Sequence, residues 1–170
     1  MNNIGLFYGS VSGNTETVAK KIGNLLELPF FHIHNVAKAT PKDLEKYENI
    51  IIGVPTWGNG VLEGVCKDFL TTLKNANLTN KKVAIFGLGD AKTYAYTFVD
   101  GLAEVYAILV EKNCDLVGFV PNKNYNFKQS KALIDNKFIG LPIDEDNEPH
   151  LTDSRIEKWI EQINEEFESW

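Results

Sequence analysis

Residues 4–15 read Ile-Gly-Leu-Phe-Tyr-Gly-Ser-Val-Ser-Gly-Asn-Thr, an apolar run that passes into a stretch rich in glycine and hydroxyl groups. The apolar part is typical of a buried β-strand. A helical pattern of apolar residues begins directly afterwards, with Val18, Ile22, Leu25 and Leu26 on one face. We therefore expect a tight turn from a strand into a helix. Unpaired N–H groups and the positive end of the helix dipole make such a helix N-terminus suitable for a phosphate.

The composition of this turn narrows the kind of phosphate that it would bind. No lysine follows Gly13, which excludes the loop that holds nucleoside triphosphates, and the spacing of Gly9 and Gly13 excludes the Gly-x-Gly-x-x-Gly dinucleotide motif. We predict a single terminal phosphate held by neutral donors, and an ordinary helix cap is the alternative. The candidate ligands are Ser10, Val11, Ser12, Gly13, Asn14 and Thr15.

Length and composition limit the classes of protein that this chain can be. Its 170 residues suit one globular domain, and the formal charge of −6, from 17 basic and 23 acidic residues, argues against nucleic-acid binding. Its two cysteines, Cys66 and Cys114, form no Cys-x-x-Cys motif, so we expect neither a metal site nor a disulfide framework. Because no signal segment or long apolar span is visible, we expect a cytoplasmic protein without a membrane segment.

Strand-like and helix-like runs alternate along most of the chain. We expect strands at 4–8, 30–36, 49–54, 82–87 and 116–120, and helices at 14–27, 63–73 and 94–112, with a connector at 37–47. Such alternation predicts an α/β domain with a parallel sheet. A polar, asparagine-rich segment at 121–136 interrupts it. An apolar run at 138–143 follows, and then a last helix at 152–167 with Thr152 as its N-cap.

Two further loops carry unusual chemistry. Ligands of open parallel sheets bind beyond the carboxyl ends of the strands, so the loops after the first, third and fourth strands should lie together. An exposed Trp57 offers a stacking surface or a packing lid, and Tyr94 offers a second aromatic face. With a phosphate cradle between them, these loops indicate a flat ring on a phosphorylated tail. The alternative is two unrelated surface aromatics. The candidate residues are Pro55, Thr56, Trp57, Gly58, Asn59 and Gly60 after the third strand, and Leu88, Gly89, Asp90 and Tyr94 after the fourth.

These motifs together resemble the long-chain flavodoxins, and the resemblance covers essentially the whole chain. It rests on residues 10–15, 55–58, 87–90 with Tyr94, and 140–147. Flavodoxin is itself a type example of the rule that places ligands at the carboxyl ends of parallel strands, so the rule and the resemblance are one argument rather than two.

The resemblance implies a fold and a cofactor. The fold would be a doubly wound, five-stranded parallel sheet of order 2-1-3-4-5 with helices on both faces. The chain 1–170 would be one domain, with an insertion at 121–136 that splits the fifth strand. One non-covalently bound FMN would lie between Trp57 and Tyr94, and Asp146 would approach its ribityl chain. The acidic residues near the ring would make its full reduction difficult.

The resemblance also implies a function. We expect a low-potential one-electron carrier without a substrate reaction of its own, a monomer that docks transiently on a reductase and on an acceptor enzyme. The alternative is an FMN-dependent quinone or azo reductase of the same fold, which would need an open ring face that two stacking aromatics disfavour. A phosphorylated signalling receiver is disfavoured because the third strand leads into Pro55, Thr56 and Trp57 instead of a phosphorylatable aspartate.

Overall fold

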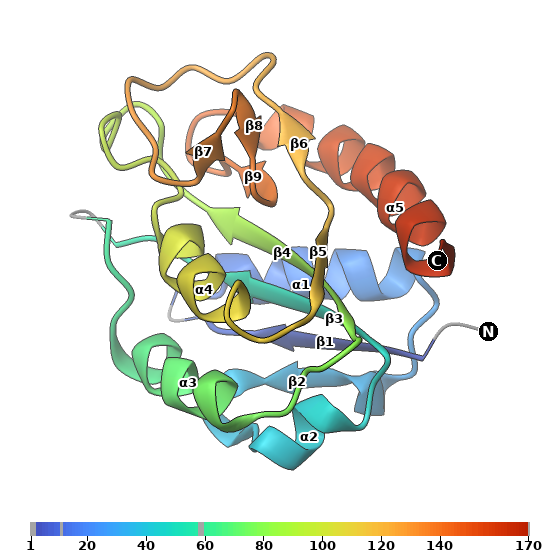
Figure 1. Cartoon of the computed structure of the whole chain (residues 1–170). Coiled ribbons are helices and arrows are strands. Elements are labelled where there is room, and N and C mark those ends of the chain that lie inside the picture. The colour runs from blue at the N-terminus through green and yellow to red at the C-terminus, as the bar shows by residue number, and fades with distance from the viewer. Residues whose placement is uncertain (1–2, 11, 58–59, 170) are drawn as a thin grey trace.

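A computed structural model describes residues 3–10, 12–57 and 60–169 of the chain (Figure 1). Three of the predicted ligand residues, Val11, Gly58 and Asn59, lie outside the described residues.

The centre of the molecule is a parallel sheet in the predicted order. It comprises β1 (Ile4–Tyr8), β2 (Ile33–Asn35), β3 (Asn49–Val54), β4 (Lys82–Leu88) and β5 (Asp115–Val117), arranged as β2-β1-β3-β4-β5. Every residue of β1 and β3 is buried. Continuous apolar strands of this kind are stable only where helices cover both faces of the sheet, which is why the sequence favoured a parallel arrangement.

Two segments share the fifth position of the sheet. β5 pairs with the first half of β4, at Lys82–Ala84, and β9 (Leu141–Ile143) pairs with the second half, at Phe86–Leu88. Between them β6 (Val120–Pro121), β7 (Leu133–Ile134) and β8 (Lys137–Phe138) form a small antiparallel sheet. The expectation of one unbroken strand at 116–120 is wrong, because Gly118 adopts a left-handed conformation with φ 80°. The run at 138–143 likewise divides into β8 and β9.

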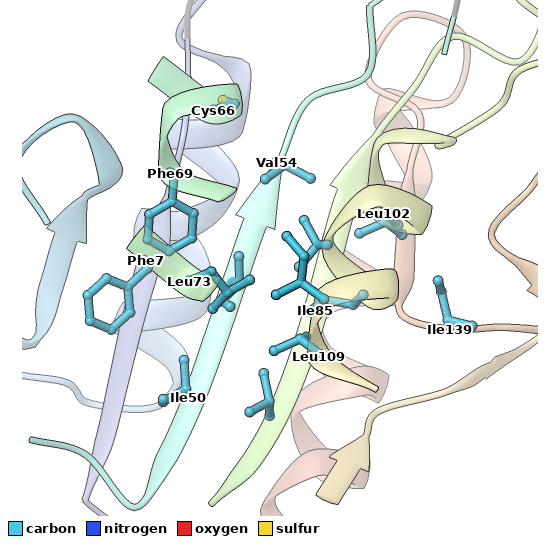
Figure 2. Close-up of a cluster of buried hydrophobic side chains, with 14 of the residues drawn as sticks. Phe7, Ile50, Val54, Cys66, Phe69, Leu73, Ile85, Leu102, Leu109 and Ile139 are labelled. Atoms are coloured by element: carbon cyan, nitrogen blue, oxygen red, sulfur yellow. The ribbon is translucent and has the colours of Figure 1, made fainter. Parts of the chain in front are cut away.

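Helices cover both faces, as predicted (Figure 1). α1 (Asn14–Leu25) and α5 (Thr152–Glu168) pack on one face. α3 (Gly64–Asn75), α4 (Gly101–Leu109) and the short α2 (Pro41–Glu45) pack on the other. Figure 2 shows the hydrophobic core between the sheet and the helices α3 and α4. Phe69 and Leu73 of α3 and Leu102 and Leu109 of α4 pack there against strand residues such as Ile85. Buried Cys66 belongs to this cluster, and the burial raises the pKa of its thiol to about 11.

The helix expected at 94–112 begins only at Gly101. Residues 91–100 form successive turns instead, and Val99 has a left-handed φ of 48°. The segment between β6 and β7 is hydrogen-bonded to the backbone here. Lys128 and Gln129 donate their N–H groups to the carbonyl oxygen of Ala95, at 2.7 and 3.0 Å. The apolar spacing of 94–112 is helical, but these long-range hydrogen bonds replace part of the helical ladder.

Smaller corrections concern the ends of elements. Most of the strand expected at 30–36 consists of two 3-10 turns, η1 (Phe30–His32) and η2 (Val36–Lys38), on either side of β2. A third turn, η3 (Pro149–Leu151), leads into α5, whose N-cap is Leu151 and not Thr152. The hydroxyl of Thr152 instead donates a hydrogen bond to the carboxylate of Glu145. That contact links the last helix to the loop after β9.

Candidate functional site

A pocket of about 270 Å³ lies where β1, β3, β4 and β9 end. Four segments that are distant in the sequence contribute to it, three of them the loops singled out from the sequence. Its lining residues are Ser12, Asn14, Thr15, Pro55, Thr56, Leu88, Gly89, Asp90, Tyr94, Glu145 and Asp146.

The first segment is the turn from β1 into α1. Gly13 is the N-cap of α1 with φ 93°, and within the described chain no side chain caps this helix. The first N–H groups of α1 are therefore not occupied by a capping side chain, which disfavours the ordinary-cap alternative and leaves them for an anion. Ser10 is not among the lining residues; its Oγ accepts a hydrogen bond from Gly13 N at 3.0 Å and so holds the turn.

The second segment follows β3. Thr56 lines the pocket, and its Oγ1 accepts a hydrogen bond from Gly101 N at 3.0 Å, which ties the loop to the start of α4. Trp57 is half-buried, so the expectation of an exposed tryptophan is wrong. Its backbone is held in a turn by bonds from Trp57 N to Val61 O and from Gly60 N to Trp57 O, at 3.3 and 2.7 Å. Gly60 lies against the side chain of Asp100 and not in the pocket lining.

The indole of Trp57 has an unusual feature. Its Nε1 is buried and has no hydrogen-bond partner among the residues that the structure describes. A buried N–H of this kind is costly unless something satisfies it.

The third segment follows β4. The carboxylate of Asp90 accepts hydrogen bonds from Lys92 N and Thr93 N, at 3.2 and 2.9 Å, and Tyr94 N donates to the carbonyl oxygen of Asp90 at 2.9 Å. This tight turn presents Tyr94, which is 45% exposed, to the pocket. The structure thus brings Leu88, Gly89, Asp90 and Tyr94 together as the sequence predicted.

The fourth segment, residues 144–147 after β9, was only partly foreseen. Asp146 lines the pocket, and so does Glu145, which sequence reasoning did not select. It also missed Asn147, whose Nδ2 donates to Asp90 at 2.8 Å and lies 3.0 Å from both carboxylate oxygens of buried Asp144. An amide directly after three acidic residues was the available signal, since such a group can hold carboxylates together.

The rim of the pocket is negative. The pKa of Asp146 is raised, first by partial burial and then by the negative charges of Asp90, Asp144 and Glu145. For Asp90 partial burial also acts to raise the pKa, but hydrogen bonds from Thr93, Asn147 and Lys92 outweigh it, and the pKa is lowered. Asp90 is therefore held as a carboxylate, and Asp146 senses the repulsion of its neighbours.

Comparison with known proteins identifies the family. The flavodoxin family model matches residues 6–159. The chain belongs to the flavodoxin family. It is 44% identical to flavodoxin of Haemophilus influenzae over 165 residues, which cover 96% of this chain and 95% of that protein. It is 42% identical to flavodoxin 1 of Escherichia coli K12 over 164 residues, which cover 96% and 93%.

A solved structure gives the same result for the fold. The crystal structure of Fusobacterium nucleatum flavodoxin bound to flavin mononucleotide superimposes with a TM-score of 0.91 at 32% identity, covering 99% of this chain and all of that one. The predicted family and the flavodoxin-like α/β fold with strand order 2-1-3-4-5 are confirmed.

Two features that would indicate other kinds of function are absent from the part of the chain that the structure describes. None of its helices combines the length and apolar character that a membrane crossing requires. Across residues 3–10, 12–57 and 60–169, no cluster of three or more His, Cys, Asp or Glu side chains is arranged to hold a metal ion.

Proposed function

We propose that this chain is a low-potential one-electron carrier that binds FMN non-covalently and has no substrate reaction of its own. The observation that carries the proposal is the convergence of three strand-end loops on one pocket, whose lining includes a helix N-terminus with neutral donors and an aromatic side chain. It is supported by membership of the flavodoxin family and by the likeness to a flavodoxin bound to FMN.

The residues present suit FMN. The uncapped start of α1, with Ser12, Asn14 and Thr15, has the donor chemistry for a phosphate. Tyr94 offers a ring face. Trp57 is the second aromatic side chain of the proposal, and its buried Nε1 has no hydrogen-bond partner among the described residues. In the proposal Ser10, Gly13 and Gly60 shape the two loops, while Val11, Gly58 and Asn59 keep the binding roles expected from the sequence.

The pocket's charge is the basis for a low potential. FMN supplies the redox chemistry when bound, and the protein sets how easily it accepts electrons. The first loop contributes neutral groups and no cation that would offset the phosphate charge. Asp90, Glu145 and Asp146 place further negative charge around the pocket, and the pKa of Asp146 is raised first by partial burial and then by the negative charges of its neighbours. Each carboxylate near the ring disfavours added negative charge on it by about 1 kcal/mol or less, because water screens the rim.

The test is reconstitution followed by a redox titration. Protein stripped of flavin should take up FMN and become yellow, and a titration with an optical readout should resolve two one-electron steps, the second well below the potential of free FMN. Failure to take up FMN would overturn the proposal. Rapid NADPH oxidation in the presence of a quinone would instead favour the reductase of the same fold.

The remaining features of the proposal concern organisation and partners. We propose one domain, with 121–136 as an insertion between the two segments that share the fifth sheet position, and a cytoplasmic monomer. Exposed Tyr94 lines the same pocket as Asp90, Glu145 and Asp146, a combination that favours brief docking on basic surfaces of a reductase and of an acceptor enzyme. Light scattering tests the monomer. Electron-transfer rates that fall steeply with added salt would support the docking surface.

A further inference from the structure

A second pocket, of about 340 Å³, lies between the segment 120–125 and the first half of α5. Figure 1 shows β6 and α5 side by side on this part of the molecule. Among the described residues none lines both this pocket and the one at the ends of β1, β3 and β4. The two pockets are therefore separate sites.

The lining of this pocket is partly apolar. Trp159 and Leu141 are each only 2% exposed and belong to the core between the sheet and α5. Val120 and Leu151 add half-buried aliphatic surface. Trp159 is fixed in place because its Nε1 donates to the carbonyl oxygen of Gly118 at 2.8 Å. A rigid aromatic and aliphatic lining of this size lies within the range of small-molecule sites.

The rest of the lining is cationic. Lys123, Arg155 and Lys158 line the pocket, and no described lining residue is acidic, although the whole chain carries a formal charge of −6. Such a concentration of positive charge against the overall balance indicates an anionic ligand.

Arg155 is held rigidly but is incompletely paired. Its side chain is 12% exposed, and its Nη2 donates to Asn124 O at 2.7 Å and to Glu148 Oε1 at 3.1 Å. Its guanidinium carbon lies 4.1 Å from the centre of the Tyr125 ring. Its Nη1 is buried and has no hydrogen-bond partner among the residues that the structure describes. An unpaired guanidinium nitrogen is costly, and a carboxylate is the acceptor that suits it best.

We propose that this pocket binds a small organic carboxylate with a flat apolar body. The carboxylate would accept from Nη1 of Arg155 and be attracted by Lys158, while the apolar body would lie against Trp159 and Leu141. The fixed guanidinium requires little ordering on binding, because Asn124, Glu148 and Tyr125 already hold it. The cationic part of the lining thus selects a negatively charged ligand, and the apolar part selects its shape.

The test uses 2-naphthoate as a probe on the full, flavin-saturated chain labelled with ¹⁵N. The indole N–H resonance of Trp159 should shift and saturate on titration. Two matched probes separate the contributions: 2-naphthalenemethanol keeps the ring without the charge, and acetate keeps the charge without the ring. Each should bind at least about tenfold more weakly than 2-naphthoate, since each lacks one of the two interactions.

Three variants assign the site. Arg155→Gln should weaken 2-naphthoate binding about tenfold. Because this change also removes the contact to Glu148, Lys158→Glu serves as a second variant at an exposed position and should weaken binding several-fold. Lys42→Glu makes the same charge change at an exposed position of α2, outside the pocket lining, and should leave binding unchanged.

Distinct results would overturn the proposal. These are no saturable shift at Trp159, shifts confined to residues 88–94, or equal binding of 2-naphthoate and 2-naphthalenemethanol. Equal losses in Lys158→Glu and Lys42→Glu would do the same, because they would reduce the effect to overall charge.

Discussion

The side-chain amide of Asn147 donates a hydrogen bond of 2.8 Å to the carboxylate of Asp90, 57 residues earlier in the chain. The same nitrogen lies 3.0 Å from both oxygens of Asp144. One amide thus fastens the turn after β4 to the loop after β9, which together contribute Asp90, Tyr94, Glu145 and Asp146 to the pocket. The geometry of this side of the site depends on a residue that does not itself line it.

Asn147→Ala should therefore loosen both loops. Buried Asp144 would lose a donor while it stays out of water, so the free energy of unfolding should fall by about 1–3 kcal/mol. The pKa of Asp90 should rise, because one of the hydrogen bonds that lowers it disappears. Urea unfolding and carboxyl NMR measure the two effects. Asn122→Ala is the control, since its side-chain amide donates a long hydrogen bond of 3.4 Å to Asn136 at the surface. An equal loss in both variants would show that Asn147 has no special role.

Thr15→Val tests the phosphate turn without changing the shape of the side chain. Thr15 is 1% exposed and lines the pocket at the start of α1, so loss of its hydroxyl should weaken FMN binding about tenfold. Riboflavin, which lacks the phosphate, should bind the variant and the parent protein equally. Thr17→Val removes a hydroxyl two residues beyond Thr15, outside the pocket lining, and should affect neither ligand. If Thr15→Val weakens riboflavin as much as FMN, the hydroxyl does not act on the phosphate.

Asp146→Asn tests the negative rim. Removing one charge next to Asp90, Asp144 and Glu145 should raise the potential of the second electron step by on the order of 20–40 mV at low salt. Added salt should shrink the difference, because this side chain lies at the surface. Asp135→Asn makes the same charge change in the turn between β7 and β8, at a left-handed φ of 50° that asparagine tolerates. A shift of equal size in Asp135→Asn would mean that only net charge matters.

Local sequence patterns predicted the turn from β1 into α1, which a single continuous segment of the chain forms. The apolar run 4–8 and the glycine-containing turn into α1 are coded by neighbouring residues, and the structure has both where they were expected. The hydrogen bond between Gly13 N and Ser10 Oγ was not predictable, because the sequence alone does not show whether this hydroxyl binds a ligand or the backbone. The outcome depends on the backbone conformation of the turn.

Interactions between distant segments explain the errors. The spacing of Phe98 and Leu102 is helical, but the carbonyl oxygen of Ala95 accepts from Lys128 and Gln129, so the helix starts late. The split fifth strand explains two further features. β9 pairs with the end of β4, which places Asn147 next to Asp90. The segment 120–125 lies against α5 and forms the pocket at Arg155. Propensity and periodicity carry no information on which distant side chain meets which.

The cap of α2 makes a prediction about pH. Thr40 N donates to Asp43 Oδ2 at 2.9 Å, Asp43 N donates to Thr40 Oγ1 at 3.3 Å, and Lys46 pairs with the other oxygen of the carboxylate. The hydrogen bond from Thr40 N is the main reason that the pKa of Asp43 is lowered. A carboxyl whose pKa is lower in the folded state stabilises the fold above its unfolded pKa of about 3.9, and this stabilisation is lost as the pH falls through the folded value.

Asp43→Ala should therefore lower the free energy of unfolding by about 1 kcal/mol at pH 7, the usual contribution of such a cap. The difference between the parent protein and the variant should persist at pH 5 and shrink as the pH falls below about 4, because the parent carboxylate is then itself protonated. Urea unfolding at these pH values measures it, with Asp135→Asn as the control that changes a carboxylate outside any cap. A difference that stays constant down to pH 2.5 would show that helix propensity, and not the ionised cap, is responsible.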